Sequence, residues 1–267
     1  MLTWVRMSGK AEARNLIVDG VDVRLSGVQI LNQVTFDVRA GEVFGIVGPN
    51  GAGKTTILNA IGGVVRPTAG TIRYGQIDLL RVQPHKMRNH GIGRSLQSTH
   101  YFRDLTVLEL VSLGQLPNSI IGALGYTSHR IRRTHKPAVG RSGGRGLEVL
   151  EQLGLGQFAD RPLSELSTAV QKLVDISRAV VAGTELLLLD EPTSGVSGQE
   201  RGTVADALGR LRELGRTVVL IDHDPGFVTS LCDRLMAMNF GQVLHVGKPD
   251  EVMSNEVVRR SYLGEEA

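Results

Sequence analysis

Gly48-Pro49-Asn50-Gly51-Ala52-Gly53-Lys54-Thr55 decides the fold, because it matches the pattern G-x-x-x-x-G-K-[ST] at every fixed position. An apolar run at residues 43–47 precedes it, and Thr56-Ile57-Leu58-Asn59-Ala60-Ile61 follows it as an expected helix. The glycines let backbone N–H groups point inward at one anion, and the helix N-terminus adds its positive dipole end. The stretch therefore predicts a loop that binds phosphates between a strand and a helix.

The polar residues of this loop have separate expected roles. Lys54 can reach the β- and γ-phosphates of a nucleotide, and the Thr55 hydroxyl can bind Mg²⁺. The predicted nucleotide-binding residues are Gly48, Pro49, Asn50, Gly51, Ala52, Gly53, Lys54, Thr55 and Thr56.

The composition favours one large α/β domain or a domain with a sizeable insertion, since 41% of the 267 residues are hydrophobic and 21% are charged. A formal net charge of +3 does not by itself indicate nucleic acid, and no nucleic-acid partner is expected. Cys232 is the one cysteine, which excludes a disulfide framework and favours a reducing compartment. No run approaches the length of a bilayer span and no signal pattern opens the chain, so we expect a cytosolic protein whose membrane role would come through a partner.

Strand and helix signals alternate along most of the chain. This alternation predicts a mostly parallel sheet that holds its ligand at the carboxyl ends of the strands. Strands are expected at residues 15–25, 33–38, 43–47, 71–74, 77–80, 92–96, 186–189, 217–221, 235–239 and 243–246, and helices at 56–61, 84–89, 198–214 and 225–231.

From Thr106 to about Ser177 helical spacing of apolar residues replaces the strand signals, which predicts an inserted helical subdomain. The expected organisation is a flexible leader at 1–14, an α/β core at 15–97 and 178–267, and the helical subdomain at 98–177. Residues 115–147 contain several Arg and Lys residues and no Asp or Glu. Such a run is typical of a solvated mobile loop, and the alternative is contact with anionic lipid headgroups or an acidic partner.

Polar residues at the ends of other expected strands complete the site. Asp190 and Glu191 follow four leucines, where Asp190 would hold Mg²⁺ through water and Glu191 would polarise the attacking water. His223 comes just after the next strand, within expected reach of the γ-phosphate. Gln97 ends another strand, where its amide can bind Mg²⁺ or orient water.

Together these residues resemble the ATP-binding-cassette (ABC) ATPases, and the resemblance extends from Asn15 to Gly264. The matching elements are the loop at Gly48 to Thr55, Gln97, a helical insertion, Leu166-Ser167 with Gln171, Leu189-Asp190-Glu191-Pro192-Thr193, and His223. Within that family, Gly91-Ile92-Gly93-Arg94-Ser95-Leu96-Gln97, Phe102-Arg103-Asp104-Leu105-Thr106-Val107 and Tyr262-Leu263-Gly264 are similar to the ATPase subunits of branched-chain amino acid importers. ATPases of lipopolysaccharide export share several of these features.

The resemblance implies an α/β P-loop NTPase fold with a mostly parallel core sheet, an N-terminal antiparallel β region and an inserted helical subdomain. It implies ATP and Mg²⁺ as ligands and a dimer of cassettes, in which Ser167 contacts the partner's ATP. Hydrolysis would drive transmembrane permease subunits at the cytoplasmic face of the cell membrane. A coupling helix of the permease would enter a groove on the helical insertion, lined by residues just after Gln97.

The chain departs from the family pattern at three places. The signature segment usually reads Leu-Ser-Gly-Gly-Gln, whereas here it is Leu166-Ser167-Thr168-Ala169-Val170, and a side chain in place of each glycine can obstruct the approach of N–H groups to a phosphate. Ser197 replaces the usual aspartate of the loop through which the two nucleotide sites communicate. Leu25 replaces the usual aromatic that stacks on adenine, so we expect the base to contribute little and ATP and GTP to bind alike.

These departures favour a heterodimer with a second, better-conforming cassette over a homodimer. Two other functions are compatible with the sequence. One is a soluble ABC ATPase that acts on nucleic acid or ribosomes, although such proteins usually carry two cassettes or a long coiled insertion. The other is a regulatory module that binds ATP but hydrolyses it poorly, which the altered signature suggests.

Overall fold

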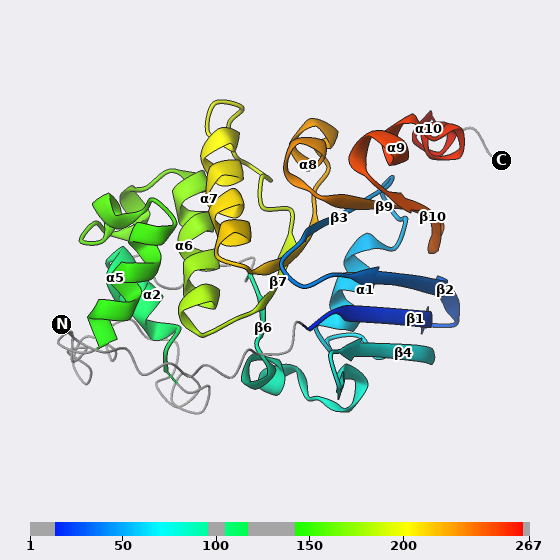
Figure 1. Cartoon of the computed structure of the whole chain (residues 1–267), viewed down its shortest axis with the longest axis horizontal. Coiled ribbons are helices and arrows are strands. Elements are labelled where there is room, and N and C mark those ends of the chain that lie inside the picture. The colour runs from blue at the N-terminus through cyan, green and yellow to red at the C-terminus, as the bar shows by residue number, and fades with distance from the viewer. Residues whose placement is uncertain (1–13, 96–104, 117–141, 264–267) are drawn as a thin grey trace.

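The phosphate-binding loop follows a central strand of a six-stranded sheet of order β10-β9-β3-β8-β7-β6 (Figure 1). The structure is a computed structural model that describes residues 14–95, 105–116 and 142–263. Five strands run parallel, and only β10 is antiparallel to its neighbour. The strands are β3 (Val43–Val47), β6 (Ile92–Arg94), β7 (Leu186–Asp190), β8 (Thr217–Ile221), β9 (Arg234–Asn239) and β10 (Gln242–Gly247).

A second, antiparallel sheet has the order β2-β1-β4-β5 and confirms the predicted N-terminal β region. Its strands are β1 (Leu16–Leu25), β2 (Val28–Val38), β4 (Ala69–Tyr74) and β5 (Ile77–Asp78). The prediction that β2 starts at residue 33 is wrong. Irregular pairing between Val18 and Arg24 and a positive φ of 52° at Gln33 break the alternation of apolar residues, which hid the first half of the strand from the sequence pattern.

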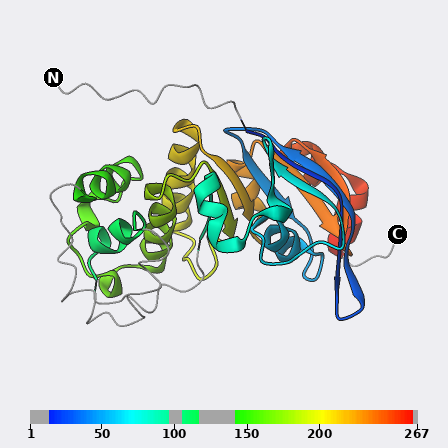
Figure 2. The same ribbon diagram turned by 90° about the horizontal axis from the view of Figure 1, so that it is seen from below.

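Helices cover the sheets and make up one end of the molecule, while β1, β2 and β4 lie at the opposite end (Figures 1 and 2). The described helices are α1 (Lys54–Ile61), α2 (Val107–Leu113), α5 (Ser142–Gln152), α6 (Thr168–Val181), α7 (Arg201–Glu213), α8 (Pro225–Leu231), α9 (Pro249–Ser254) and α10 (Glu256–Leu263). Short 3-10 turns are η1 (Leu79–Arg81), η2 (Pro84–His90), η4 (Gly156–Phe158) and η5 (Leu163–Glu165). Within residues 105–116 and 142–181 the described elements are helical, as the sequence predicts.

Several predicted boundaries differ from the structure for local reasons. The strand expected at 77–80 ends at Asp78, because the Asp78 carboxylate accepts a hydrogen bond from Leu80 N and starts η1. The helix expected at 198–214 is α7, which begins only at Arg201. α6 extends to Val181, so the boundary drawn at residue 177 falls inside a helix. Gln97, residues 1–13 of the leader and residues 117–141 of the basic run lie outside the described residues.

The parallel sheet separates two hydrophobic cores. Alternate residues of its buried strands face opposite sides, so that Leu187 and Leu189 of β7 join one core and Leu186 and Leu188 the other. The first core contains α2, α5, α6, α7 and α8, and the second contains α1 and the antiparallel sheet. Burial on both faces explains why these strands are continuous apolar runs in the sequence. No helix among the described residues has the length and apolar character required to cross a membrane.

The packing around Gly45 in β3 gives a test of this fold. A Cβ at Gly45 would lie 2.5 Å from Leu235 Cδ2 and 2.7 Å from Val228 Cγ1. We expect Gly45→Ala to lower the free energy of unfolding by about 1–3 kcal/mol, because the core has no room for the methyl group. Gly202 in α7 is the control, since nothing lies within 4 Å of its added Cβ. Gly202→Ala should stabilise the helix by up to about 1 kcal/mol in denaturant titrations, and equal effects of the two changes would contradict the packing.

Candidate functional site

The phosphate-binding loop is held in a conformation that glycine permits. Gly48 and Gly53 have φ angles of 151° and 98°. A Cβ on Gly48 would lie 2.2 Å from the Met238 carbonyl oxygen, and one on Gly53 would lie 2.7 Å from Leu31 Cδ2. The loop is therefore pressed between the end of β9 and strand β2. Gly53 has no side chain to cap α1, so the first N–H groups of this helix face a ligand site without competition from a capping side chain.

Lys54 lies over the loop that it is predicted to serve. Its Nζ donates to the carbonyl oxygens of Gly48 and Pro49, at 2.8 Å each. Burial lowers the pKa of Lys54, and the charges of Glu191 and Asp190 act in the opposite direction. The ammonium is thus partly removed from water and faces two carboxylates, an arrangement in which phosphate oxygens can accept its hydrogen bonds.

Asp190 ends β7 as a buried carboxylate, with 4% of its side chain exposed. Its Oδ2 lies 3.3 Å from Arg94 Nη2, and Arg94 also donates to the Asn59 side chain of α1. Burial raises the pKa of Asp190, and the negative charge of Glu191 raises this pKa further. The positive charges of Arg94 and Lys54 lower it. A bound cation would stabilise the charged form of this buried carboxylate, which has lost the water that would otherwise do so.

Glu191 adopts an unusual backbone conformation at the expected catalytic position. Its φ of 50° lies in the left-handed region, where a glutamate is rare and where strain is associated with functional sites. Glu191 N donates to Ile221 O at 2.8 Å, and Glu191 O accepts from Lys172 Nζ at 2.8 Å. These contacts fasten the backbone of Glu191 to β8 and to α6.

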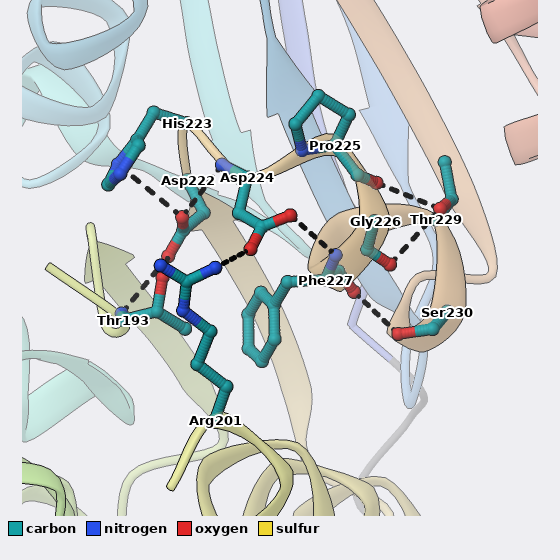
Figure 3. Close-up of polar contacts among 10 residues, drawn as sticks. All are labelled: Thr193, Arg201, Asp222, His223, Asp224, Pro225, Gly226, Phe227, Thr229 and Ser230. Carbon is teal, nitrogen blue, oxygen red and sulfur yellow. Dashed lines mark hydrogen bonds and ion pairs between the residues drawn. The ribbon is translucent and has the colours of Figure 1, made fainter. Parts of the chain in front are cut away.

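Asp222 is the buried centre of a hydrogen-bond network that joins the ends of β7 and β8 (Figure 3). Its Oδ2 accepts from Thr193 N at 3.0 Å and from Thr193 Oγ1 at 2.6 Å. Its Oδ1 accepts from Asp224 N at 3.1 Å and lies 3.6 Å from His223 Nδ1. The His223 side chain is 58% exposed and lies on the site's surface, beside this buried carboxylate. Asp222 therefore fixes the two segments that carry Glu191 and His223.

The signature segment begins α6. Ser167 is the N-cap of this helix, and hydrogen bonds from Ser167 and Ser197 lower the pKa of Glu200. Thr168 and Ala169, which replace the usual glycines, differ in exposure. Ala169 is buried in the first core, and only Thr168 of the two is exposed, because α6 turns one face inward from its first turn.

The structure brings most predicted site residues to one edge of the parallel sheet. The phosphate loop follows β3, the acidic pair Asp190 and Glu191 ends and follows β7, and His223 follows β8. Gln97 lies outside the described residues, and Ser167, the N-cap residue of α6, is hydrogen-bonded to Glu200 of its own chain.

Sequence reasoning missed the supporting residues Asp222, Arg94 and Lys172. Asp222 directly precedes His223 after a buried strand, and that position was the one available signal. Nothing in the sequence links Arg94 to Asp190 or Lys172 to Glu191.

The residues present fit a nucleoside triphosphate with Mg²⁺. The glycine cradle and Lys54 provide donors for phosphate, and Thr55 and Asp190 provide oxygen ligands of the kind that Mg²⁺ prefers. Among the described residues no group of three or more His, Cys, Asp and Glu could hold a metal by itself. Mg²⁺ commonly uses one or two protein oxygens together with substrate phosphates and water, so a site of this size suits it.

A glycine-rich loop after one parallel strand, with an acidic pair at the end of a nearby strand, is the arrangement of a P-loop nucleoside triphosphatase. The chain belongs to the ABC transporter family, whose profile matches residues 31–194. It is an ATP-binding, transport-coupled ATPase cassette of that family, which confirms the predicted fold class and activity.

Proteins of named function match nearly the whole chain. LivG, a high-affinity branched-chain amino acid transport ATP-binding protein of Salmonella typhimurium, is 34% identical over 94% of this chain and 98% of its own length. BraF of Pseudomonas aeruginosa, also a high-affinity branched-chain amino acid transport ATP-binding protein, is 32% identical over 94% of this chain and 98% of its own length. Among solved structures, this chain is similar to the ADP conformation of an ATP-binding cassette of an ABC transporter. The comparison gives a TM-score of 0.84 at 27% sequence identity and covers 94% of this chain and 99% of that one.

The Asp222 network predicts a measurable coupling with Thr193. Thr193→Val and Asp222→Asn should each lower the free energy of unfolding, because a buried polar group loses its partner. In a double-mutant cycle the two changes should couple by about 1–3 kcal/mol. Thr229→Val is the control, since the Thr229 hydroxyl bonds to carbonyls of α8 near the surface and should not couple to Asp222. Additive effects of Thr193→Val and Asp222→Asn would contradict the network.

Proposed function

We propose that this chain is the ATP-hydrolysing subunit of a branched-chain amino acid importer. The observation that carries the proposal is its likeness to LivG and BraF over 94% of this chain and 98% of theirs. Similarity limited to the nucleotide site would support only membership of the ABC ATPases. Similarity along nearly the whole length of both chains also includes the regions outside the nucleotide site. The test is co-purification with the permease subunits and ATP-dependent uptake of labelled leucine, isoleucine and valine into vesicles.

The residues of this chain would divide the work of hydrolysis. Lys54 and the N–H groups of the loop and of α1 would bind and orient the phosphates. Thr55, Asp190 and Gln97 would hold Mg²⁺, which when bound neutralises charge on the phosphates. The Glu191 carboxylate would orient and deprotonate the attacking water. Backbone hydrogen bonds of Glu191 with Lys172 and Ile221 hold this residue in position. His223, beside Asp222, would contact the γ-phosphate.

The subunit would work at the cytoplasmic face of the cell membrane, where its permease partners span the bilayer.

A heterodimer with a second cassette is the arrangement that the site favours. The nucleotide-binding half of this chain has a complete set of loop residues and acids. The half offered to a partner's ATP is altered, since Thr168 is exposed beside Ser167, and Ser197 donates to Glu200 of its own chain at 2.8 Å. Pairing with a cassette that has a complete signature would leave one fully formed site, built on the phosphate loop of this chain.

Substitutions at Glu191 and Lys54 test the assigned roles. Glu191→Gln should keep Mg·ATP binding but lower hydrolysis by roughly 10²- to 10⁴-fold, because the base is removed and the phosphate cradle stays whole. Lys54→Ala should weaken binding itself, since the ammonium contacts the phosphates. Binding is measured by titration with ATP and turnover by phosphate release from the assembled complex. Normal turnover of Glu191→Gln would show that another group is the base.

Matched substitutions in the two cassettes test the heterodimer. The change Glu→Gln is made at Glu191 here, and separately at the equivalent glutamate of the partner, and each complex is assayed for transport. The asymmetry described above requires the change at Glu191 to abolish transport and the partner's change to be mild. Equal losses, or full ATPase activity of this chain purified alone, would argue for a symmetric dimer.

A further inference from the structure

Phe240 combines two features that rarely occur together in a large aromatic residue. It lies in the turn between β9 and β10 with 80% of its surface exposed, and its φ is 42°. A bulky side chain in the left-handed region is a true outlier, and such strain is retained where the surroundings hold it in place. The Asn239 side chain helps to hold Phe240 in this conformation, because Asn239 Oδ1 accepts a hydrogen bond from Phe240 N at 3.1 Å. The turn thus holds an apolar ring out in solvent.

This turn is fastened directly to the phosphate-binding loop. Gly241 N donates to Ala52 O at 3.0 Å, and Asn32 N of β2 donates to Gly241 O at 2.9 Å. The contact is close, since a Cβ added to Gly53 would lie 3.5 Å from Gly241 Cα. Phe240 is therefore one residue from a backbone hydrogen bond to the phosphate-binding loop.

The order of the strands gives the direction of a bound nucleotide. In the sheet, β8 and β7 lie on one side of β3 and β9 lies on the other (Figure 1). His223 follows β8, and Asp190 and Glu191 lie at the end of β7, so the γ-phosphate must point toward that side to react. The nucleoside end of the same molecule then leaves the loop on the side of β9 and β2. The turn that carries Phe240 lies on that side, where Gly241 is hydrogen-bonded to Ala52 of the loop and to Asn32 of β2.

We propose that the ring of Phe240 stacks on the base of the bound nucleotide. The inference rests on the proposed binding of ATP at the phosphate loop. It supplies an aromatic contact that Leu25, the residue at the usual stacking position, cannot provide. Stacking on one ring tolerates any base, so ATP and GTP should both benefit from it.

Two probes separate a contact with the base from an effect on the phosphate cradle. ATP contains the base, whereas inorganic tripolyphosphate contains only the phosphate chain, and each is titrated into the purified full-length chain with Mg²⁺. Phe240→Asn removes the ring but keeps a residue that tolerates the left-handed turn, and Phe240→Trp keeps a ring. Val64→Asn is the control, because Val64 is another exposed apolar residue, 62% exposed, in the segment after α1.

We expect Phe240→Asn to bind ATP about tenfold more weakly, within the range of base–aromatic stacking, and tripolyphosphate unchanged. Phe240→Trp and Val64→Asn should bind both probes like the unaltered chain. Unchanged ATP affinity in Phe240→Asn would overturn the inference, and equal losses for both probes would overturn it in favour of a role in shaping the loop. If the unaltered chain bound neither probe, the nucleotide site itself would be wrong, which is a different result from a failure at Phe240 alone.

Discussion

The close packing of the phosphate loop against two neighbouring segments is the constraint on which the site depends. Gly48 approaches the Met238 carbonyl of β9, and Gly53 approaches Leu31 of β2, at distances that leave no space for a Cβ. The loop is therefore shaped by both sheets at once. The antiparallel sheet takes part through β2, whose residues Ile30 and Leu31 pack against Gly53 of the loop. The turn before Gly241 completes this enclosure and carries Phe240.

The charged groups around this loop are partly buried and have therefore lost part of their hydrating water. Burial raises the pKa of Asp190 and lowers the pKa of Lys54, and each charge partly compensates the other. Such a group of partly buried charges interacts strongly with a ligand that carries both signs, such as a triphosphate with a divalent cation. Arg94 and Asp222 fix the geometry of the site, because Arg94 pairs with the Asp190 carboxylate and Asp222 accepts a hydrogen bond from Thr193 N. The same contacts join α1, β6, β7 and β8 into one framework.

The two halves of the cassette differ in how closely they keep the family pattern. The half built on β3, β7 and β8 keeps its residues, whereas the half built on the start of α6 has lost its glycines. The side chain of Ala169 packs in the core, so that Thr168 is the exposed one of the two replacements. The half built on the start of α6 therefore has fewer exposed altered positions than the sequence indicates. These positions are limited to Thr168 and to Ser197, whose hydroxyl is engaged by Glu200.

The sequence by itself determined the phosphate loop, the acidic pair, His223 and the parallel sheet, because each is written in a contiguous pattern: a fixed motif, an apolar run that ends in acids, or a strand followed by a polar residue. It missed the first half of β2, where irregular pairing interrupts the alternation. Only the tertiary structure decided that Asp222 holds Thr193, that Lys172 holds the Glu191 backbone, that Ala169 is buried, and that Phe240 lies beside the loop. The physical reason is that these contacts join segments far apart in the chain, and the order of strands in the sheet, which no local pattern specifies, brings them together.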